Sequence, residues 1–366
     1  MSNEESTASP LDFCRIDSSF DTTELLQRIE EILVEGDSHN AASFSEKKWT
    51  WQYKNLLTGD ARIYVCVCDG KIVGYYHVPV YEGVVNNEKK NFAMVQDVAV
   101  SATMRGRSVF RKLAEFATND LVNSDINLIY TFPNQKSIHT FLKYNGYKQI
   151  YTYDSYILPV ATSAIIKSKL SLFGFEKPVG WLADKYFDLR NCKMAKGSEV
   201  KKIDQFDEEI AGLFHRFNSN FLCHLNRTKN YLQWRFFNKP IGKHFLITLQ
   251  NDSKTLAAAV FKLDEILGTN TAIVLDFAFE GELHLAQLLH FVRKNSMSLF
   301  DEKISMIFTA CCCDKFLQNK TYGLIKIPQR FNPRPLNLLV RNITEDEREV
   351  LKAQNWLALL SDWDVL

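Results

Sequence analysis

The chain carries an internal repeat. Residues 48–70 align with residues 231–253 without a gap, so the shift between the two segments is constant. Trp51 then matches Trp234, and Gly59 matches Gly242. Three further segments match in the same order: 95–100 with 274–279, 128–131 with 306–309, and 144–147 with 320–324. One sparse match can arise by chance, but four in the same order indicate two half-chains built on one plan.

Each half is expected to form helix, helix, strand hairpin, strand, helix, strand, helix and strand. Apolar residues recur at helical spacing from Leu25 to Leu33, directly after a capping-box pattern at 21–24. The pair Asp69-Gly70 is typical of a tight hairpin turn, and Gly146 is a plausible helix C-cap. The other elements expected in this half are a helix at 45–57, strands at 62–68, 71–80 and 92–100, a helix up to about 122, a strand at 128–132, a helix at 137–144 and a strand at 147–158.

The composition is that of a globular protein in water, with 46% hydrophobic and 24% charged residues and a net charge of +1. This balance creates no field that would attract nucleic acid or an anionic membrane. The polar N-terminus does not resemble a secretory signal, and Lys167 and Lys169 interrupt the nearest candidate for a membrane span, 157–175. Eight cysteines without a repeating framework fit a reducing compartment. We therefore expect a cytoplasmic protein with no membrane span, no nucleic-acid partner and no metal site.

A basic, glycine-containing turn follows the strand-like run 92–100. It reads Arg105-Gly106-Arg107-Ser108 and leads into a helix-like run. The first N–H groups of a helix have no partner within it and point the same way, and the positive end of the helix dipole lies beneath them. Arg111 and Lys112 add positive charge. Together these features predict an anion site suited to a pyrophosphate, and hence a nucleotide-like cofactor.

The turn Arg105-Gly106-Arg107-Ser108-Val109-Phe110 and the later Phe132-Pro133-Asn134 resemble the GNAT superfamily of acyl-CoA-dependent N-acyltransferases. The similarity is to bacterial members whose turn reads RGxGxF and whose later strand ends in FPN. In the second half the similarity rests on 231–236 and on the ending Trp356 with 361–364. The resemblance spans nearly the whole chain. It implies a mixed α/β fold of two GNAT-like domains in tandem, each a mostly antiparallel, twisted sheet flanked by helices.

The resemblance also implies a division of the chain. Residues 1–160 would form an N-terminal acyl-CoA-binding domain, and residues 161–195 would be a connector. Residues 196–366 would form a C-terminal GNAT-like domain without the pyrophosphate turn.

The co-substrate implied by the resemblance is acetyl-CoA or another acyl-CoA. The backbone of Val98, Ala99 and Val100 would pair with the pantetheine arm like an added strand. The N–H groups from Arg107 to Arg111 would hold the pyrophosphate, and Asn134 would reach the pantetheine or the acyl carbonyl. The cofactor-binding set is therefore Val98, Ala99, Val100, Arg105, Gly106, Arg107, Ser108, Val109, Phe110, Arg111 and Asn134.

Transfer of an acyl group to an amine needs a proton acceptor, a donor to the thioester oxygen and an acid for the leaving thiolate. Asp97, beside the expected cofactor strand, is the candidate base, with a strand-end structural role as the alternative. Tyr144 is the candidate acid, because Phe141 stands where many family members place a tyrosine; a packing role is its alternative. Backbone N–H near Val98 is the donor that the resemblance implies. Ser108 is a second departure, since the family pattern has glycine there.

The second half lacks the basic turn. Glu280 and Glu282 stand where the first half has arginines, and two carboxylates there would repel a diphosphate. One cofactor site, in the first half, is therefore expected. Arg235, flanked by aromatic residues, needs an anionic partner, and Asp362 and Asp364 are open to three roles: pairing with Arg235, attracting a cationic amine, or simply being solvated.

The sequence thus predicts an N-acyltransferase, most simply an N-acetyltransferase, that transfers an acyl group to an amine of a small molecule or sugar-like precursor. Two alternatives remain open. One is a catalytically degenerate acyl-CoA-binding or protein-interaction module, suggested by Ser108 and Phe141. The other is a longer-chain acyltransferase or an aminoacyl-tRNA-dependent ligase of related fold. The acceptor and the oligomeric state are not predicted.

Overall fold

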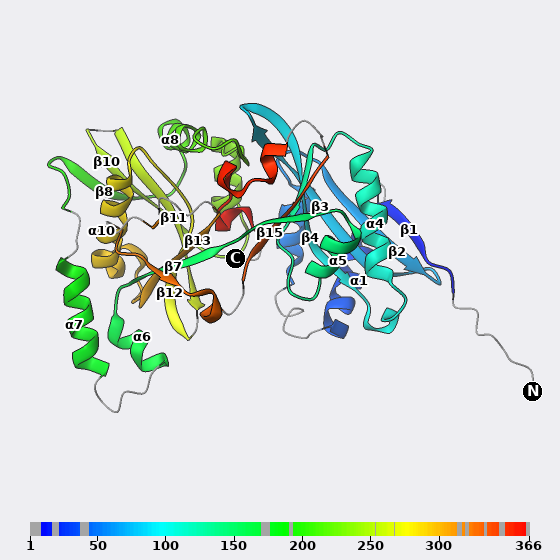
Figure 1. The fold of residues 1–366 in the computed structure, drawn as a ribbon, viewed down its shortest axis with the longest axis horizontal. Coiled ribbons are helices and arrows are strands. Elements are labelled where there is room, and N and C mark those ends of the chain that lie inside the picture. The colour runs from blue at the N-terminus through cyan, green and yellow to red at the C-terminus, as the bar shows by residue number, and fades with distance from the viewer. Residues whose placement is uncertain are drawn as a thin grey trace, which may run out of the picture. The chain divides into compact units, whose positions relative to one another are not determined.

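The computed structural model describes residues 9–16, 22–36, 44–169, 176–189, 193–252, 254–266, 268–312, 317–318, 322–332, 335–343 and 348–363. The described chain forms two compact units, each built on a mixed sheet (Figure 1). Unit 1 comprises Met1–Gly83, Lys90–Ile150 and Asn337–Leu351, and unit 2 comprises the remaining segments. The expected mixed α/β fold with two sheets flanked by helices is confirmed.

The sheet of unit 1 follows the order β1-β2-β3-β4-β5-β15-β6. Its β1–β2, β2–β3 and β5–β15 pairs are antiparallel, while β4 and β5 run parallel. The strands are β1 (Asp12–Ile16), β2 (Ala61–Cys68), β3 (Lys71–Val85), β4 (Glu88–Val100), β5 (Leu128–Thr131), β15 (Asn337–Asn342) and β6 (Lys148–Thr152). The helices are α1 (Thr22–Gly36), α3 (Glu46–Trp49), the π-helical turn η1 (Thr50–Lys54), the 3-10 turn η2 (Ala102–Met104), α4 (Val109–Val122) and α5 (Ile138–Tyr144).

Helices cover both faces of this sheet. On one face, Leu113, Ala117 and Leu121 of α4 are fully buried in a cluster with side chains of β2, β3 and β4. On the other face, the predicted apolar stripe of α1 packs with Trp49 of α3 against β2 and β3. The capping-box residue Asp21 lies outside the described residues. Gly146 follows α5 with φ of 70°, as expected of a residue that ends a helix in the left-handed region.

The sheet of unit 2 follows the order β14-β7-β13-β12-β11-β10-β8. Its strands are β7 (Asp154–Pro159), β8 (Ser198–Ile203), β10 (His244–Asn251), β11 (Lys254–Ile266), β12 (Thr269–Phe279), β13 (Met306–Cys311) and β14 (Ile325–Ile327). Two short strands outside this sheet, β9 (Cys223–Leu225) and β16 (Trp356–Leu357), pair with each other in parallel. The helices are α6 (Thr162–Lys169), α7 (Glu176–Leu189), α8 (Glu208–Asn218), α9 (Lys229–Leu232), the π-helical turn η3 (Gln233–Phe237) and α10 (Glu282–Phe300). Four 3-10 turns complete the described elements: η5 (Gln329–Phe331), η6 (Arg348–Leu351), η7 (Ala353–Asn355) and η8 (Leu360–Asp362).

The repeat in the sequence is a repeat in the structure. In both halves a short α-helix runs into a π-helical turn, η1 and η3, that carries the matched tryptophans Trp51 and Trp234. The matched hairpins β2–β3 and β10–β11 follow, and each has an irregular register near its turn. Asp69 and Asp252 occupy the same left-handed turn position, with φ of 50° and 47°. Such local agreement, including a rare π-helical turn, supports a duplicated plan.

The two halves exchange one strand each. The sequence indicated a single strand over 147–158 that would close the first half, and this was wrong: the segment divides into β6, which stays in the first sheet, and β7, which lies between β13 and β14. In return, β15 from the end of the chain lies between β5 and β6. The connector expected at 161–195 contains α6 and α7 and belongs to unit 2.

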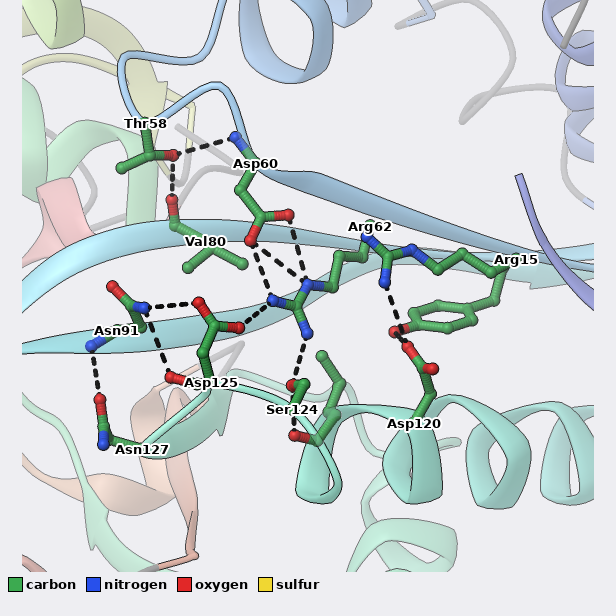
Figure 2. Close-up of polar contacts among 12 residues, drawn as sticks. Arg15, Thr58, Asp60, Arg62, Val80, Asn91, Asp120, Ser124, Asp125 and Asn127 are labelled. Carbon is green, nitrogen blue, oxygen red and sulfur yellow. Dashed lines mark hydrogen bonds and ion pairs between the residues drawn. The ribbon is translucent and has the colours of Figure 1, made fainter. Parts of the chain in front are cut away.

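A buried arginine ties the beginning of β4 and β5 together in unit 1. Figure 2 shows the Arg62 guanidinium between Asp60 and Asp125, with Nη2 3.0 Å from an oxygen of Asp60. Asp125 also accepts a hydrogen bond from the Asn91 amide at 2.9 Å. Burial opposes the charge of Arg62, but the two carboxylates raise its pKa. The α4–β5 connection is thereby fixed to β2 and β4.

Candidate active site

Strands β4 and β5 separate halfway along β4. They pair in parallel from Phe92 with Leu128 to Val95 with Thr131, where the Thr131 hydroxyl donates to the Val95 carbonyl at 2.9 Å. β5 ends there, whereas β4 continues to Val100. The side chains at 98–100 are half-buried. The β5-facing edge of 96–100 therefore has no partner in β5, which is the arrangement that an extended, amide-bearing ligand needs in order to add to a sheet.

The turn after β4 presents free backbone donors. The N–H of Arg105 bonds to the Ala102 carbonyl and the N–H of Arg107 bonds to the Met104 carbonyl, both at 3.3 Å. The first bond of α4 runs from the N–H of Lys112 to the Ser108 carbonyl at 3.0 Å. Between them, the N–H groups of 108–111 have no acceptor among the described residues. The donors predicted for a pyrophosphate are therefore present, with the exception of the Arg107 N–H, which is already paired.

Two residues of this turn have left-handed backbone. Gly106 has φ of 82°, and a Cβ added there would meet no atom within 4 Å. Ser108 has φ of 56° and ψ of 24°, and its side chain makes no capping hydrogen bond to α4. A residue with a Cβ pays about 1–2 kcal/mol for this conformation. Glycine adopts left-handed backbone without this cost. This explains why the GNAT pattern that the turn resembles has glycine at the position of Ser108.

The basic side chains of the turn do not all lie together. Arg105 and Lys112 are exposed. Arg111 lies 3.7 Å from Glu115, with its guanidinium 5.3 Å from the centre of the Tyr144 ring. The Arg107 guanidinium instead donates to the Ser9 carbonyl and lies 3.5 Å from the sulfur of Cys68. The side-chain charge near the helix start thus comes from Arg105, Arg111 and Lys112.

Asp97 interrupts β4 at the point of separation. It is exposed and has φ of 45°, which is unusual for a non-glycine residue in a strand. Its carboxylate accepts a hydrogen bond of 2.5 Å from the hydroxyl of Tyr53, and that hydroxyl accepts one of 3.2 Å from the Gln96 amide. The candidate base is therefore solvent-accessible and held in place by a residue of η1.

A buried histidine supports Asp97 from β3. The indole N–H of Trp49 donates to Nε2 of His77 at 3.0 Å, and Nδ1 of His77 lies 3.0 Å from the Asp97 carbonyl oxygen. His77 is fully buried, and this burial lowers its pKa. The rings of Tyr53 and Tyr75 flank it, with centroids 4.5 Å and 5.3 Å away.

Asn134 stands at the start of α5. Its side-chain oxygen accepts from the N–H groups of Lys136 and Ser137 at 2.9 Å and 3.0 Å. The oxygen thus stabilises the turn before α5, and the side-chain NH₂ is the part of Asn134 that could donate to a ligand.

The candidate acid Tyr144 and the neighbouring Phe141, both on α5, differ in burial. Phe141 is buried against Phe110 and Tyr147, with ring centroids 5.8 Å and 5.1 Å away. Tyr144 is 40% exposed and lies against the cationic groups of Arg111 and Lys143. No phenol therefore takes the place that Phe141 occupies, and Tyr144 lies beside the basic turn. His139, on the same helix, is exposed.

Sequence reasoning did not identify Tyr53, His77 and Trp49 as site residues. One signal was available for Tyr53: it is a tyrosine where the repeat has Phe236, and only the first half carries the basic turn. No comparable signal marks His77, since an isolated histidine in an apolar strand is more often a core residue. Trp51 and Trp234, the matched tryptophans of the repeat, are both buried.

In unit 2 the corresponding separation of strands is filled by the chain itself. β12 and β13 pair from Thr271 to Ile273 and then diverge. Here too a threonine bonds across the two strands, since the Thr309 hydroxyl donates to the Val274 carbonyl at 3.4 Å. The C-terminal segment 358–361 lies along both strands beyond that point: the N–H of Cys312 bonds to the Ala358 carbonyl at 2.9 Å, and the Ser361 hydroxyl bonds to Asp276 at 2.6 Å. The position available to a ligand in unit 1 is thus occupied in unit 2.

A buried ion network anchors this segment. Arg227 is fully buried and lies 2.8 Å from Asp276 and 2.9 Å from Asp362. Burial alone would lower the pKa of Arg227, but the two carboxylates raise it. Asp362 is therefore neither solvated nor free for a substrate amine, and its partner is Arg227, which the sequence did not single out. Asp364 lies outside the described residues.

Arg235 serves the same segment. Its guanidinium is buried, and Nε donates to the Ser361 carbonyl at 2.9 Å. The guanidinium also reaches the Trp363 carbonyl at 3.4 Å. Backbone carbonyls of the C-terminal segment are thus partners of Arg235 that the sequence analysis did not consider.

The helix start of unit 2 is acidic, as predicted. Glu280 forms ion pairs with Arg216 at 2.9 Å and with Lys254 at 3.6 Å, and α10 begins at Glu282. These contacts pair one carboxylate with basic side chains of the protein itself, so Arg216 and Lys254 are engaged by Glu280. A second pyrophosphate site is not favoured here.

The described residues contain neither a metal-binding cluster nor a helix suited to crossing a membrane. No group of three or more His, Cys, Asp or Glu side chains there could hold a metal ion. Of the helices in the described part of the chain, none combines the length and apolar character that a bilayer crossing requires.

Comparisons with known proteins place the fold. Residues 37–150 match the family described as acetyltransferase (GNAT) domain. Among solved structures, the chain is similar to a GCN5-related N-acetyltransferase from Anabaena variabilis (TM-score 0.63, 11% identity, covering 92% of this chain and 73% of that chain). It is also similar to a probable N-acyltransferase from Enterococcus faecalis (0.64, 11%, 92% and 73%) and to Saccharomyces cerevisiae N-myristoyltransferase with bound myristoyl-CoA (0.56, 12%, 90% and 82%). No curated protein matches the sequence.

Proposed function

Because residues 37–150 match the acetyltransferase (GNAT) domain family, we propose that the chain is an acyl-CoA-dependent N-acyltransferase whose single cofactor site lies in unit 1. The observation that carries this proposal is the combination of two features at one end of β4. The strand leaves β5 after Val95, and the next helix begins with unpaired N–H groups at 108–111. The first suits the amide-bearing arm of coenzyme A, and the second suits its pyrophosphate.

In the proposed complex, the backbone of 98–100 pairs with the pantetheine arm. The N–H groups of 108–111 bind the pyrophosphate, with Arg105, Arg111 and Lys112 adding charge around it. The NH₂ group of Asn134 is the donor left for the pantetheine or the acyl carbonyl. We retain acetyl as the simplest acyl group and a small-molecule amine as the acceptor. In this proposal residues 1–160 are the half of the chain that supplies the cofactor site. Residues 161–195 connect the two halves, and residues 196–366 are the half without a pyrophosphate turn.

The proposed reaction is direct transfer in a ternary complex. The neutral amine forms a C–N bond to the thioester carbon, the C–S bond breaks, and CoA leaves as a thiolate. Asp97 accepts the proton that the amine loses, directly or through water, and Tyr144 is the candidate donor to the thiolate. An N–H donor near Val98 stabilises the negative charge on the carbonyl oxygen. Tyr53 keeps the Asp97 carboxylate beside this point.

Titration calorimetry with acetyl-CoA and CoA tests the cofactor site. We expect one molecule bound per chain and a loss of at least tenfold in affinity in Arg105→Glu. Lys148→Glu, at an exposed lysine on β6, is the matched control and should bind normally. Two molecules per chain, or equal affinity in both variants, would contradict the proposal. Mass-resolved incubation with a mixture of acyl-CoAs and a panel of amines then identifies the acyl length and the acceptor.

One observation favours a second function, a silent acyl-CoA-binding module. The residue in the family's acid position is Phe141, which is buried among aromatic rings. A silent module would bind CoA with the same stoichiometry but give no product with any amine. Measurable turnover in the amine panel separates the two functions.

A further inference from the structure

Resting on the proposed acyl transfer, we infer that His77 is a positioning residue that sets the direction of the Val98 N–H. Three features of unit 1 support this role: the Trp49–His77 hydrogen bond, the His77–Asp97 hydrogen bond and the left-handed backbone of Asp97.

The contacts of His77 determine its tautomer. An indole N–H can only donate, so Nε2 of His77 must accept from Trp49 and carries no proton. The ring proton is then on Nδ1, which donates to the Asp97 carbonyl oxygen 3.0 Å away. Complete burial keeps the ring neutral. His77 is thus a fixed donor aimed at one backbone carbonyl.

That carbonyl fixes the next N–H through the geometry of the peptide bond. The peptide between Asp97 and Val98 is trans, since the described chain has no cis peptide bond. In a trans peptide, C=O and N–H point in opposite directions. With the Asp97 oxygen held towards His77 of β3, the Val98 N–H points away from His77, and β5 does not pair with this part of β4. A donor in that direction can meet an oxygen that gains charge during acyl transfer.

This peptide needs support, because Asp97 has φ of 45° and left-handed backbone costs a residue with a Cβ about 1–2 kcal/mol. A flip of the peptide would turn the carbonyl into the gap and the N–H out of it. His77 holds the carbonyl and Tyr53 holds the carboxylate, so the same residue is secured at two points.

The second half of the chain shows that the sheet does not need this histidine in order to form. The hairpin β10–β11 matches β2–β3, and Val260 corresponds to His77 in this match. The register of β11 and β12 is irregular there, between Val260 and Phe261, and Asp276 is not among the residues with positive φ. A strand irregularity thus forms beside a side chain without a donor. The directed histidine belongs only to the half with the candidate site.

Two substitutions with side chains of similar size distinguish the role of Nδ1 of His77 from that of Nε2. His77→Asn places an amide NH₂ near the position of Nδ1 and can keep the bond to the Asp97 carbonyl. His77→Gln reaches towards the position of Nε2 and loses that bond. Trp49→Phe is a third variant, which keeps an aromatic ring and removes the indole donor that fixes the tautomer.

The first measurement needs no turnover: the amide resonance and the HN–Hα coupling of Val98, read by NMR in the free protein. A flip of the Asp97–Val98 peptide changes φ of Val98, which this coupling reports. We expect both to change in His77→Gln and to stay near wild type in His77→Asn. Unchanged values in folded His77→Gln would overturn the inference, whatever the enzyme does. Should His77→Gln fail to fold, Trp49→Phe carries the same comparison, because a free tautomer would broaden or shift the Val98 resonance.

The second measurement is kinetic. We expect kcat to fall about 100-fold in His77→Gln, with CoA affinity within about twofold of wild type and at least tenfold recovery in His77→Asn. Equal kcat values in wild type, His77→Gln and His77→Asn would overturn the role of His77 in catalysis. Failure of the wild-type protein to bind CoA would instead reject the proposed function, and the NMR comparison would still decide on the geometry.

Discussion

At the scale of single residues, the candidate site is marked by left-handed backbone without glycine. Asp97 and Ser108 have φ of 45° and 56°, and both lie where ligand groups are expected, whereas Asp69 is in a hairpin turn. Strain of this kind persists only where surrounding contacts hold it. Asp97 has such contacts in Tyr53 and His77, but the Ser108 side chain makes no capping bond to α4.

Replacement of Ser108 by glycine should therefore stabilise the protein. Glycine removes the penalty of a Cβ at positive φ but loses more entropy on folding, so the net gain is about 0.5–1 kcal/mol. Urea unfolding measures it. Ser137→Gly is the matched control, because Ser137 precedes α5 with φ of −97° and gains nothing from glycine. Equal or lower stability of Ser108→Gly would show that Ser108 is not strained.

His77 should also make stability depend on pH. Burial lowers the pKa of His77 in the folded protein, so on acidification the unfolded chain takes up a proton near pH ~6.5 that the folded chain does not bind. Stability is therefore fully present above this pH and falls below it, with a limiting slope of about 1.4 kcal/mol per pH unit for one histidine. His224 and His244, whose pKa burial lowers to about 4, act in the same direction.

Comparison of wild type with His77→Asn isolates the share of His77. Urea unfolding between pH 7.5 and 5 should give a shallower loss of stability in the variant. Parallel curves would mean that His77 binds a proton equally well in both states.

At the scale of elements, the network of Arg62 shows how the sheet prepares the separation of β4 and β5. It holds the α4–β5 connection at the end where the two strands pair (Figure 2). The strands can then part at the other end without the register slipping. Sequence periodicity predicted these strands and α4, but a network among Asp60, Arg62 and Asp125 depends on three segments meeting in space.

Arg62→Met should destabilise unit 1 by roughly 1–3 kcal/mol. The figure is below that for a fully buried pair, because the side chains of Asp60 and Asp125 are 32% and 64% exposed and water can solvate them. Arg15→Met is the control: the Arg15–Asp120 pair is about half exposed at 3.5 Å, and its loss should cost less than about 0.5 kcal/mol. Chemical denaturation of both variants checks the difference, and similar losses would contradict the structural role of Arg62.

At the scale of the whole molecule, the repeat was predictable and the strand exchange was not. Matched residues such as Trp51 and Trp234 reveal a common plan, because each half must bury the same positions. The sequence of β7 does not predict which of the two sheets this strand joins, because an inner strand of either sheet would bury Tyr156 and Leu158 equally well. Likewise, the cofactor turn could be read from the chain, whereas the contacts of His77 could not.

The exchange predicts that residues 1–160 will not form a stable domain alone. The fragment lacks β15, whose Leu338, Leu339 and Val340 are fully buried. Burial of three such side chains contributes roughly 5–9 kcal/mol, which is comparable to the whole stability of a typical domain. Circular dichroism and limited proteolysis of the fragment beside the full chain test this. A fragment that unfolds cooperatively with the stability of the full chain would contradict it.

The most direct test of the account is an amide-resolved NMR titration of the full chain with CoA. We predict that the amide resonances of 98–100 and 108–111 shift together and saturate at one equivalent, while those at the matched helix start of unit 2, 280–285, stay in place. Shifts confined to unit 2, or a saturable shift elsewhere that leaves 108–111 unmoved, would contradict the claim that unit 1 binds coenzyme A through the edge of β4 and the start of α4.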